Sequence, residues 1–374
     1  MHALPKRPST DIHALSFTEF RERFEPLLGP LRVTVVRDFA FIDLPCNRPP
    51  WLDTGIDLDA GQWVTTFAVG KTHLAGAEFW FGADFQLWCR VGAEGEVFRG
   101  TRASQSFVTD EPGRLYLASY FPGEWATRQG SLNTPEEVYA QASGHLAVLV
   151  IRWKAEPAEG LQALAALGDV EGLVAGEIDR LLHPASPPPG WNYLWFVGPA
   201  EIYQPSLAPG RQSVIGCHTH RDVGLLQKDV DLPLRPRTRL RWSWRMEQLP
   251  SAVREDRLPT HDYLSIAVEF DNGQDLTYYW SAELPIGTAY RCPIPTWTSR
   301  ETHVVVRSGA EGLGQWFDEE RDVYQDYLQY LGTPAPAAIV RVWLIAVSLF
   351  QGREGRCQYA NVAFIAGDET IPVR

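Results

Sequence analysis

Hydrophobic and polar residues alternate along much of the chain, which is the pattern of strands with one buried face. Residues 239–247 show it most clearly, with Arg and Glu between the apolar positions. The apolar face of that strand carries Leu240, Trp242, Trp244 and Met246. Residues 261–270 repeat the pattern, and the Asp271-Asn-Gly-Gln274 turn after them predicts a hairpin. Residues 145–153 and 341–350 are apolar on both faces and predict central strands.

The first half contains further strand signals and two helical segments. Residues 63–69, 79–91 and 115–119 are strand-like runs separated by Gly, Asp and Pro. Ser16 precedes Glu19 by three residues, a capping-box spacing that predicts a short helix over 16–28. Residues 159–182 are rich in Ala and Leu and predict one long helix.

The segment 183–190 reads His-Pro-Ala-Ser-Pro-Pro-Pro-Gly and predicts a boundary between two domains. Proline has a fixed φ and no N–H donor, so consecutive prolines favour a stiff, extended spacer. We therefore predict an all-β protein of two β-sandwich domains, of jelly-roll or carbohydrate-binding-module type. The predicted N-terminal sandwich spans 1–157, the helix and proline-rich linker span 158–190, and the C-terminal sandwich spans 191–374.

Composition narrows the classes of partner. The net charge of −12 and pI near 5.3 argue against nucleic acid and against an anionic membrane. No apolar run is long enough to span a bilayer, and no secretory leader is visible, so we expect a cytoplasmic protein. The five cysteines are widely dispersed, without a Cys-x-x-Cys pair, and are expected to be reduced thiols. We predict no metal and no cofactor. Fourteen Trp, 17 Phe and 13 Tyr favour aromatic packing or an aromatic binding surface.

Residues 51–153 resemble the galactophilic bacterial lectins, which are calcium-dependent jelly-roll sandwiches. The similarity rests on residues 51–63, on the run Leu-Trp-Cys-Arg-Val-Gly at 87–92, on Gly-Arg-Leu-Tyr-Leu-Ala at 113–118, and on 144–150. In that family an Asp- and Asn-rich loop after the Gly-x-Leu-Tyr-Leu strand binds calcium and sugar. Here the corresponding loop, Ser119-Tyr-Phe-Pro-Gly-Glu-Trp125, carries aromatic residues instead. The resemblance therefore implies the fold but not the calcium site.

The second half resembles an uncharacterised bacterial all-β domain family of unknown function. The matching pieces include Trp-Ser-Trp at 242–244, Tyr-Trp-Ser at 279–281 and the segment 316–327. Two positions depart from the family pattern. An acidic pair is replaced by His261-Asp262, and an Asp- and Thr-rich loop is replaced by Ser348-Leu-Phe-Gln351. The resemblance implies a fold and no reaction.

The most concentrated polar motif is Cys217-His-Thr-His-Arg-Asp222. If this segment is extended, His218, His220 and Asp222 point to one side. Such a group can bind a metal, contact a polar ligand or transfer a proton, or it can be a structural or exposed segment. Asp262, at the start of an apolar strand face, is either a general base with a raised pKa or a capping carboxylate.

These observations predict a protein that holds a small organic or glycosidic ligand in an aromatic-lined pocket between the two sandwiches. The predicted ligand-binding residues are Trp125, Tyr120, Asp222, Tyr279, Trp280 and Trp244. The alternative is a cofactor-independent lyase, isomerase or cyclase in which His218, His220 or Asp262 moves a proton. No hydrolase elbow, nucleotide-binding loop or His-Glu-x-x-His motif is present.

Overall fold

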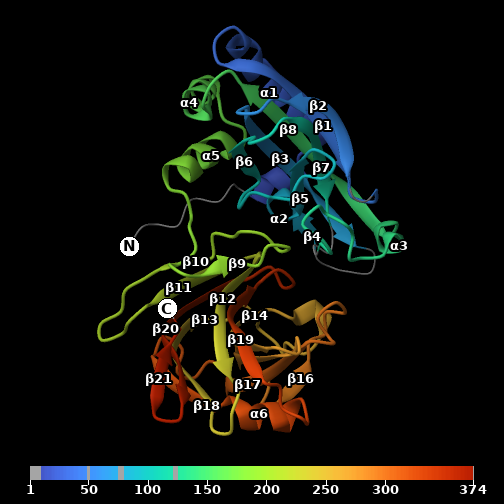
Figure 1. Ribbon diagram of the computed structural model, residues 1–374. Coiled ribbons are helices and arrows are strands. Elements are labelled where there is room, and N and C mark those ends of the chain that lie inside the picture. The colour runs from blue at the N-terminus through green and yellow to red at the C-terminus, as the bar shows by residue number, and fades with distance from the viewer. Residues whose placement is uncertain (1–9, 49–50, 75–79, 121–124, 374) are drawn as a thin grey trace. The chain divides into compact units, whose positions relative to one another are not determined.

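A computed structural model describes residues 10–48, 51–74, 80–120 and 125–373 of the chain (Figure 1). The chain divides into two compact units. The N-terminal unit comprises Met1–Ala185 and Phe196–Pro199. The C-terminal unit comprises Ser186–Trp195 and Ala200–Arg374. Both units are β-sandwiches, as the sequence predicts.

The N-terminal unit begins with the predicted amphipathic helix. Helix α1 spans Phe17–Leu28, and the capping box between Ser16 and Glu19 is present. The Glu19 backbone N–H donates to the Ser16 hydroxyl, and the Ser16 backbone N–H donates to the Glu19 carboxylate. Phe20, Phe24 and Leu28 are fully buried, so the apolar stripe of the helix faces the core.

Two sheets form the N-terminal sandwich. The first has the order β1 (Val36–Pro45), β8 (Ala142–Trp153), β3 (Trp63–Leu74) and β4 (Trp80–Gly82), with β6 (Ser104–Val108) paired to β3. The second has the order β2 (Leu52–Leu58), β7 (Gly113–Ser119) and β5 (Leu87–Val91). Strand β8 lies between two neighbours and is buried on both faces over most of its length, which confirms the prediction for 145–153.

Two predicted elements of this unit are shorter than expected. The run 79–91 was predicted as one strand-like stretch, and its described part contains β4, a helical turn α2 (Ala83–Gln86) and β5. The long helix predicted over 159–182 is instead two helices, α4 (Pro157–Leu167) and α5 (Leu173–Leu182). Gly168 and Gly172 between them adopt positive φ, which a continuous helix does not allow. Both helices pack into the N-terminal core, through Leu161, Leu164, Leu173 and Val174.

The C-terminal sandwich is larger. Its six-stranded sheet has the order β10 (Tyr203–Pro205), β11 (Ile215–His220), β20 (Glu354–Ala366), β13 (Arg239–Gln248) and β18 (Phe317–Asp322), with β21 (Glu369–Pro372) on β20. Its seven-stranded sheet has the order β16 (Ala289–Arg291), β17 (Glu301–Ser308), β15 (Asp275–Ser281), β14 (Tyr263–Phe270), β19 (Ala338–Val347), β12 (Val223–Pro233) and β9 (Asn192–Tyr193). The remaining described helices are the short α-helices α3 (Glu136–Tyr139) and α6 (Val323–Tyr330) and the 3₁₀ helices η1 (Thr10–Ala14), η2 (Gly29–Arg32) and η3 (Leu258–Thr260).

The core of the C-terminal unit lies between these sheets and confirms the alternation in the sequence. The apolar side chains of β13 at 240, 242, 244 and 246 and those of β14 at 264, 266, 268 and 270 belong to one buried cluster. Strand β19 lies between β14 and β12, in agreement with its apolar character on both faces. The predicted hairpin joins β14 to β15, and Gly273 adopts the positive φ that its turn requires.

None of the helices in the described part of the chain is both long and apolar enough to cross a membrane.

The fold predicts how far the N-terminal unit can be shortened. The Arg99 side chain is almost fully buried, and its Nε donates to the carbonyl oxygen of Val197, 2.8 Å away. A fragment 1–185 lacks that acceptor, whereas a fragment 1–199 keeps it. We expect both fragments to fold, with 1–185 less stable by about 1–3 kcal/mol because a buried donor loses its acceptor. Urea denaturation followed by circular dichroism measures the difference. Equal stability, or failure of both fragments to fold, contradicts the prediction.

Candidate functional site

A surface hollow in the N-terminal unit is the candidate functional site. It lies at the end of the first sheet where β8 ends and where β1 and β3 begin. The tight turn Asp59–Gln62 forms part of its wall, with Gly61 at positive φ and the Gln62 N–H donating to the Asp59 carbonyl. The hollow has a volume of about 400 Å3, which is sufficient for a small ligand.

Arg37 reaches this hollow because of a bulge in β1. Val36 pairs with Trp153 and Asp38 pairs with Arg152, so Arg37 is an extra residue on its strand. Its Nη1 donates to Asp59 Oδ2 at 2.7 Å and to Gln62 Oε1 at 2.6 Å. The other two guanidinium nitrogens, Nε and Nη2, have no hydrogen-bond partner among the described residues. The Arg37 and Asp59 side chains are 46% and 69% exposed, so both remain accessible to a ligand.

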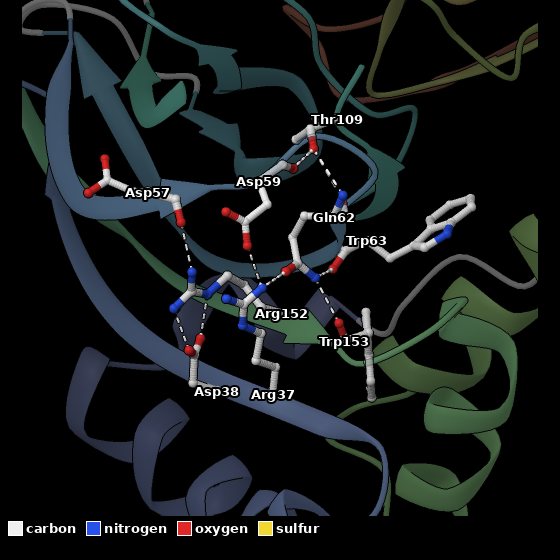
Figure 2. Close-up of polar contacts among 9 residues, drawn as sticks. All are labelled: Arg37, Asp38, Asp57, Asp59, Gln62, Trp63, Thr109, Arg152 and Trp153. Atoms are coloured by element: carbon white, nitrogen blue, oxygen red, sulfur yellow. Dashed lines mark hydrogen bonds and ion pairs between the residues drawn. The ribbon is translucent and has the colours of Figure 1, made fainter. Parts of the chain in front are cut away.

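Gln62 is the buried polar group on which this arrangement rests. Only 6% of the residue is exposed. Its Nε2 donates to the carbonyl oxygens of Trp63 at 3.0 Å and Trp153 at 2.7 Å, which fixes Oε1 toward Arg37. Figure 2 shows Gln62 between the ionic side chains on one side and the two tryptophans on the other. A buried amide with all these partners holds one orientation, so the guanidinium of Arg37 is held in place as well.

The two tryptophans that line the hollow differ in exposure. Trp63 is half-buried, whereas Trp153 is almost fully buried and donates from Nε1 to Thr65 Oγ1 at 2.7 Å. Gly160 of α4 lies directly against the Trp153 ring, where a Cβ atom would approach to 2.2 Å. The indole of Trp153 is therefore fixed by close packing, and Trp63 supplies the more accessible aromatic surface.

The charged side chains that line the hollow are already engaged in contacts within the protein. A second ionic group lies beside Arg37, in which Arg152 donates to both carboxylate oxygens of Asp38 and to the Asp57 carbonyl (Figure 2). Of the charged side chains that line the hollow, Arg37 is paired with Asp59, and Lys154 donates to the backbone carbonyl oxygens of Arg32 and Val33. A guanidinium already paired with a carboxylate offers little net charge to a ligand, so the site favours a neutral, hydrogen-bonding ligand over an ion.

Asp59 is the one carboxylate among the residues that line the hollow. A calcium ion takes six to eight oxygen ligands, usually with several carboxylates. This hollow therefore does not have the composition of a calcium site. In the loop where the lectin family binds calcium, residues 121–124 lie outside the described residues.

Two of the predicted ligand-binding residues, Tyr120 and Trp125, lie in the interior of the N-terminal unit. Tyr120 is fully buried and Trp125 is 3% exposed. Their rings stack with centroids 3.8 Å apart, and Trp51 stacks on Trp125 at 5.0 Å. The aromatic residues of this loop thus pack on one another, and the structure does not bring them to the hollow beside Gln62.

The histidine motif of the C-terminal unit is extended, as expected, but its polar side chains diverge. On β11, Cys217 and Thr219 are buried, and His218 and His220 occupy the other, partly exposed face. His218 Nε2 lies 3.5 Å from the Glu354 carboxylate of the neighbouring strand. Asp222 lies beyond the positive-φ residue Arg221, and its carboxylate accepts from the His220 backbone N–H at 2.7 Å. Asp222 therefore caps a turn and does not join the two imidazoles in a metal-binding triad.

Asp262 acts as a cap on another turn. It is fully buried, and its two carboxylate oxygens accept from the backbone N–H groups of Phe350 at 3.0 Å and Gln351 at 2.7 Å. Burial raises the pKa of Asp262 to about 6, although these hydrogen bonds lower it. The raised pKa agrees with the prediction. Asp262 is fully buried, whereas His220 lies on the partly exposed face of β11, and proton transfer by this pair stays a prediction.

The remaining predicted residues are interior residues of the C-terminal unit. Trp244 is fully buried and donates from Nε1 to Glu319 at 3.0 Å, and Trp280 is 2% exposed and donates from Nε1 to the Gly309 carbonyl at 2.8 Å. Tyr279 is also fully buried, and its hydroxyl accepts from the Tyr290 hydroxyl at 3.0 Å. Burial raises the pKa of Tyr279 above its ordinary value.

Sequence reasoning missed Arg37, Asp59 and Gln62. The segment Asp-Ala-Gly-Gln-Trp at 59–63 was used only as a sign of the fold, although a Gly turn that ends in a buried amide could have drawn attention. Sequence reasoning also predicted no metal site. Among the residues that the structure describes, one buried group has the side chains of such a site, namely His261, Cys292, Glu301 and His303.

Comparison with known sequences gives one family match, to a family without an assigned function. The family described as "Protein of unknown function (DUF3047)" matches residues 189–363, just under half of the chain. No curated protein sequence matches the chain.

Comparison with solved structures gives matches of low sequence identity and low TM-score. The N-terminal domain of EclA, a PllA-like lectin, is 16% identical over 31% of this chain and 98% of its own, with a TM-score of 0.25. The xyloglucanase domain of NopAA from Sinorhizobium fredii, solved with cellobiose, is 9% identical over 47% of this chain and 93% of its own, with a TM-score of 0.30. An ENZbleach xylanase mutant is 9% identical over 51% of this chain and 86% of its own, with a TM-score of 0.27. TM-scores of this size carry no conclusion about this chain's activity.

The raised pKa of Asp262 predicts a pH dependence of stability. Between about pH 4 and pH 6 the folded protein keeps the proton on Asp262 while the unfolded chain releases it. Stability must therefore fall as pH rises through this range, by at most about 3 kcal/mol for this group. The Asp262→Asn variant cannot titrate there. We expect wild type to lose stability relative to Asp262→Asn between pH 4 and pH 6 in urea denaturation. A constant difference, or one that changes with the opposite sign, contradicts the prediction.

Proposed function

We propose that the N-terminal unit binds a small neutral polyhydroxylated ligand, a sugar or a glycoside, in the hollow beside Gln62. The observation that carries this proposal is the fixed Gln62–Arg37–Asp59 group at an accessible surface. The proposal keeps the class of ligand predicted from the sequence and assigns it to different residues. The lyase, isomerase or cyclase alternative depended on His218, His220 and Asp262, and no observation in the structure favours it.

The polar groups of the hollow suit a hydroxyl-rich ligand. A sugar hydroxyl both donates and accepts, so a sugar site needs fixed donors and acceptors side by side. Arg37 offers Nε and Nη2 as donors, and the Asp59 carboxylate offers acceptor capacity beyond its bond to Arg37. Both groups are already held in place, so a ligand does not have to order them, and less binding free energy is lost.

The ring of a sugar also has an apolar face, and the half-buried Trp63 supplies an aromatic surface for it. The pairing of Arg37 with Asp59 leaves little net charge beside Gln62, which disfavours a strongly anionic or cationic ligand. Together these features support a neutral saccharide over a phosphorylated one. They also support binding without calcium, since the hollow has only one carboxylate in its lining.

Binding can be tested on the full chain with neutral mono- and disaccharides, galactose and cellobiose among them. We expect at least one to bind, with chemical-shift or saturation-transfer signals that depend on Arg37 and Asp59. Arg37→Ala and Asp59→Asn should each weaken binding by about 1–3 kcal/mol, because each removes a hydrogen bond to the ligand. Arg21→Ala is the matched control, since Arg21 forms an exposed ion pair with Glu25 on α1 of the same unit. Binding of no saccharide, or binding that survives the Arg37→Ala and Asp59→Asn double substitution, contradicts the proposal.

Calcium dependence separates this site from that of the galactophilic lectins. We expect saccharide binding to be the same with added Ca²⁺ and with the calcium chelator EGTA, as measured by isothermal titration calorimetry. Loss of binding in EGTA, restored by Ca²⁺, would assign binding to a lectin-type calcium site instead.

A further inference from the structure

The outer face of the seven-stranded sheet in the C-terminal unit is polar and yet buried. All residues of β14 and β15 are buried, although only alternate positions face the core between the sheets. The outer face carries Tyr263 of β14, Thr277 of β15, and Glu301 and His303 of β17, each at most 3% exposed. The segments before β14 and between β15 and β17 contribute further buried residues, among them Glu255, His261 and Cys292. Polar groups this deeply buried need partners, and most of them have one.

Four side chains with metal-binding atoms converge on this face. His261 lies between the 3₁₀ turn Leu258–Thr260 and β14, and Cys292 directly follows β16. Glu301 and His303 are alternate residues of β17 and therefore point to the same side. One ligand atom from each of the four lies within 4.8 Å of the others, and all four residues are buried. Three separate chain segments thus bring one carboxylate, one thiol and two imidazoles together.

The surrounding hydrogen bonds orient these side chains as metal ligands are oriented. His261 Nδ1 lies 2.6 Å from the Glu255 carbonyl oxygen, which can only accept, so the proton is on Nδ1. Nε2 then carries the lone pair and lies 3.4 Å from the Cys292 sulfur. A histidine that donates one ring N–H to a backbone carbonyl and directs the other nitrogen to the ion is the common arrangement in metal sites.

Glu301 is oriented in the same way. Its Oε1 accepts from the Tyr263 hydroxyl at 3.1 Å and from the Thr277 hydroxyl at 3.0 Å. Its ion-pair partner among the described residues is His303, and no Lys or Arg of that part of the chain pairs with it. A carboxylate that is almost fully buried without a guanidinium or an ammonium partner lacks the compensation that such a charge requires.

His303 is the side chain that most clearly lacks a partner. It is fully buried, and neither of its ring nitrogens has a hydrogen bond of acceptable geometry in the described part of the chain. Its Nε2 lies 3.3 Å from Glu301 Oε1. A buried polar group without a hydrogen bond destabilises the fold by about 1–3 kcal/mol, so its presence calls for a partner. A metal ion in the cluster would be that partner.

The distances and charges fit a tetrahedral zinc ion. Bonds of about 2.0–2.3 Å to nitrogen, oxygen and sulfur place the ligand atoms of a tetrahedral zinc site about 3.4 Å apart. The His261–Cys292 distance of 3.4 Å and the His303–Glu301 distance of 3.3 Å already have that value. A thiolate and a carboxylate together carry two negative charges, which Zn²⁺ neutralises. Thiolate and imidazole ligands select zinc over Ca²⁺ or Mg²⁺.

We propose that His261, Cys292, Glu301 and His303 bind one Zn²⁺ ion in a closed, structural site of the C-terminal unit. Four protein ligands leave no position for a substrate, which is the property of structural rather than catalytic zinc sites. The ion would fasten the segment before β14 and the connection between β15 and β17 to the outer face of the sheet. This inference is independent of the saccharide proposal, which concerns the N-terminal unit.

Metal content of the full chain, produced in zinc-supplemented medium, tests the proposal. We expect about one zinc ion per chain by elemental analysis, and strongly reduced zinc in Cys292→Ser and His303→Gln. Cys357→Ser is the matched control, because Cys357 is a buried thiol of the same unit outside the cluster. His218→Gln is a second control on a partly exposed histidine. Both controls should retain zinc.

Cobalt substitution identifies the ligands directly. After unfolding with a chelator and refolding with Co²⁺, the wild-type chain should show a thiolate-to-cobalt charge-transfer band and tetrahedral ligand-field bands. The charge-transfer band should be absent in Cys292→Ser and present in Cys357→Ser. Tyr263→Phe removes one hydrogen bond to Glu301 and should weaken zinc binding about 10- to 100-fold in a chelator competition.

The proposal is overturned if the wild-type chain neither contains stoichiometric zinc nor develops the cobalt band on refolding. A charge-transfer band that persists in folded Cys292→Ser also overturns it. If Cys292→Ser does not fold, the wild-type spectrum decides together with Cys217→Ser and Cys357→Ser, in which the band must remain.

Discussion

A polar group that is removed from water must find a partner inside the protein, and this constraint governs both proposed sites. In the N-terminal unit, burial of Gln62 forces its amide to bond to two carbonyl oxygens and to Arg37. These bonds determine where the guanidinium lies. In the C-terminal unit the same constraint applies to a whole sheet face, and neither ring nitrogen of His303 meets it among the described residues. Buried hydrogen bonds therefore fix the proposed ligand site beside Gln62. The proposed metal site is recognised because hydrogen bonds to His303 are missing.

The sequence predicts helices and strands well where the spacing of apolar residues stays regular along the whole element. The alternation at 239–247 and 261–270 gave strands β13 and β14 with the expected apolar faces, and the capping box gave α1. The prediction failed where a glycine changed the local conformation. Gly168 and Gly172 divide the helix predicted over 159–182, because helical periodicity of apolar residues does not reveal a positive φ.

The candidate sites were less predictable, because alternation does not show what covers the second face of a strand. The predicted ligand-binding residues Tyr279 and Tyr120 have the right chemistry, but neighbouring segments bury them. The cluster around His303 joins residues that are distant along the chain: His261 lies 31 positions before Cys292, and Cys292 lies nine positions before Glu301. Glu301 and His303 are the one pair whose shared face follows from spacing alone. The other two depend on loops whose paths the sequence does not specify.

A carboxylate with a structural role in this protein differs from one with a functional role in its remaining acceptor capacity. That capacity is the ability of its oxygens to accept further hydrogen bonds or to bind a cation. Asp262 uses both oxygens on the backbone of the turn at 350–351, so its raised pKa reflects burial within the fold. Asp59 keeps acceptor capacity at an exposed surface beside a guanidinium with unused donors. Glu301 satisfies one oxygen from two hydroxyl groups but has no full cationic partner. A carboxylate thus caps a turn at Asp262 and is proposed to face a ligand at Asp59 and a metal ion at Glu301, and its neighbours decide which role it has.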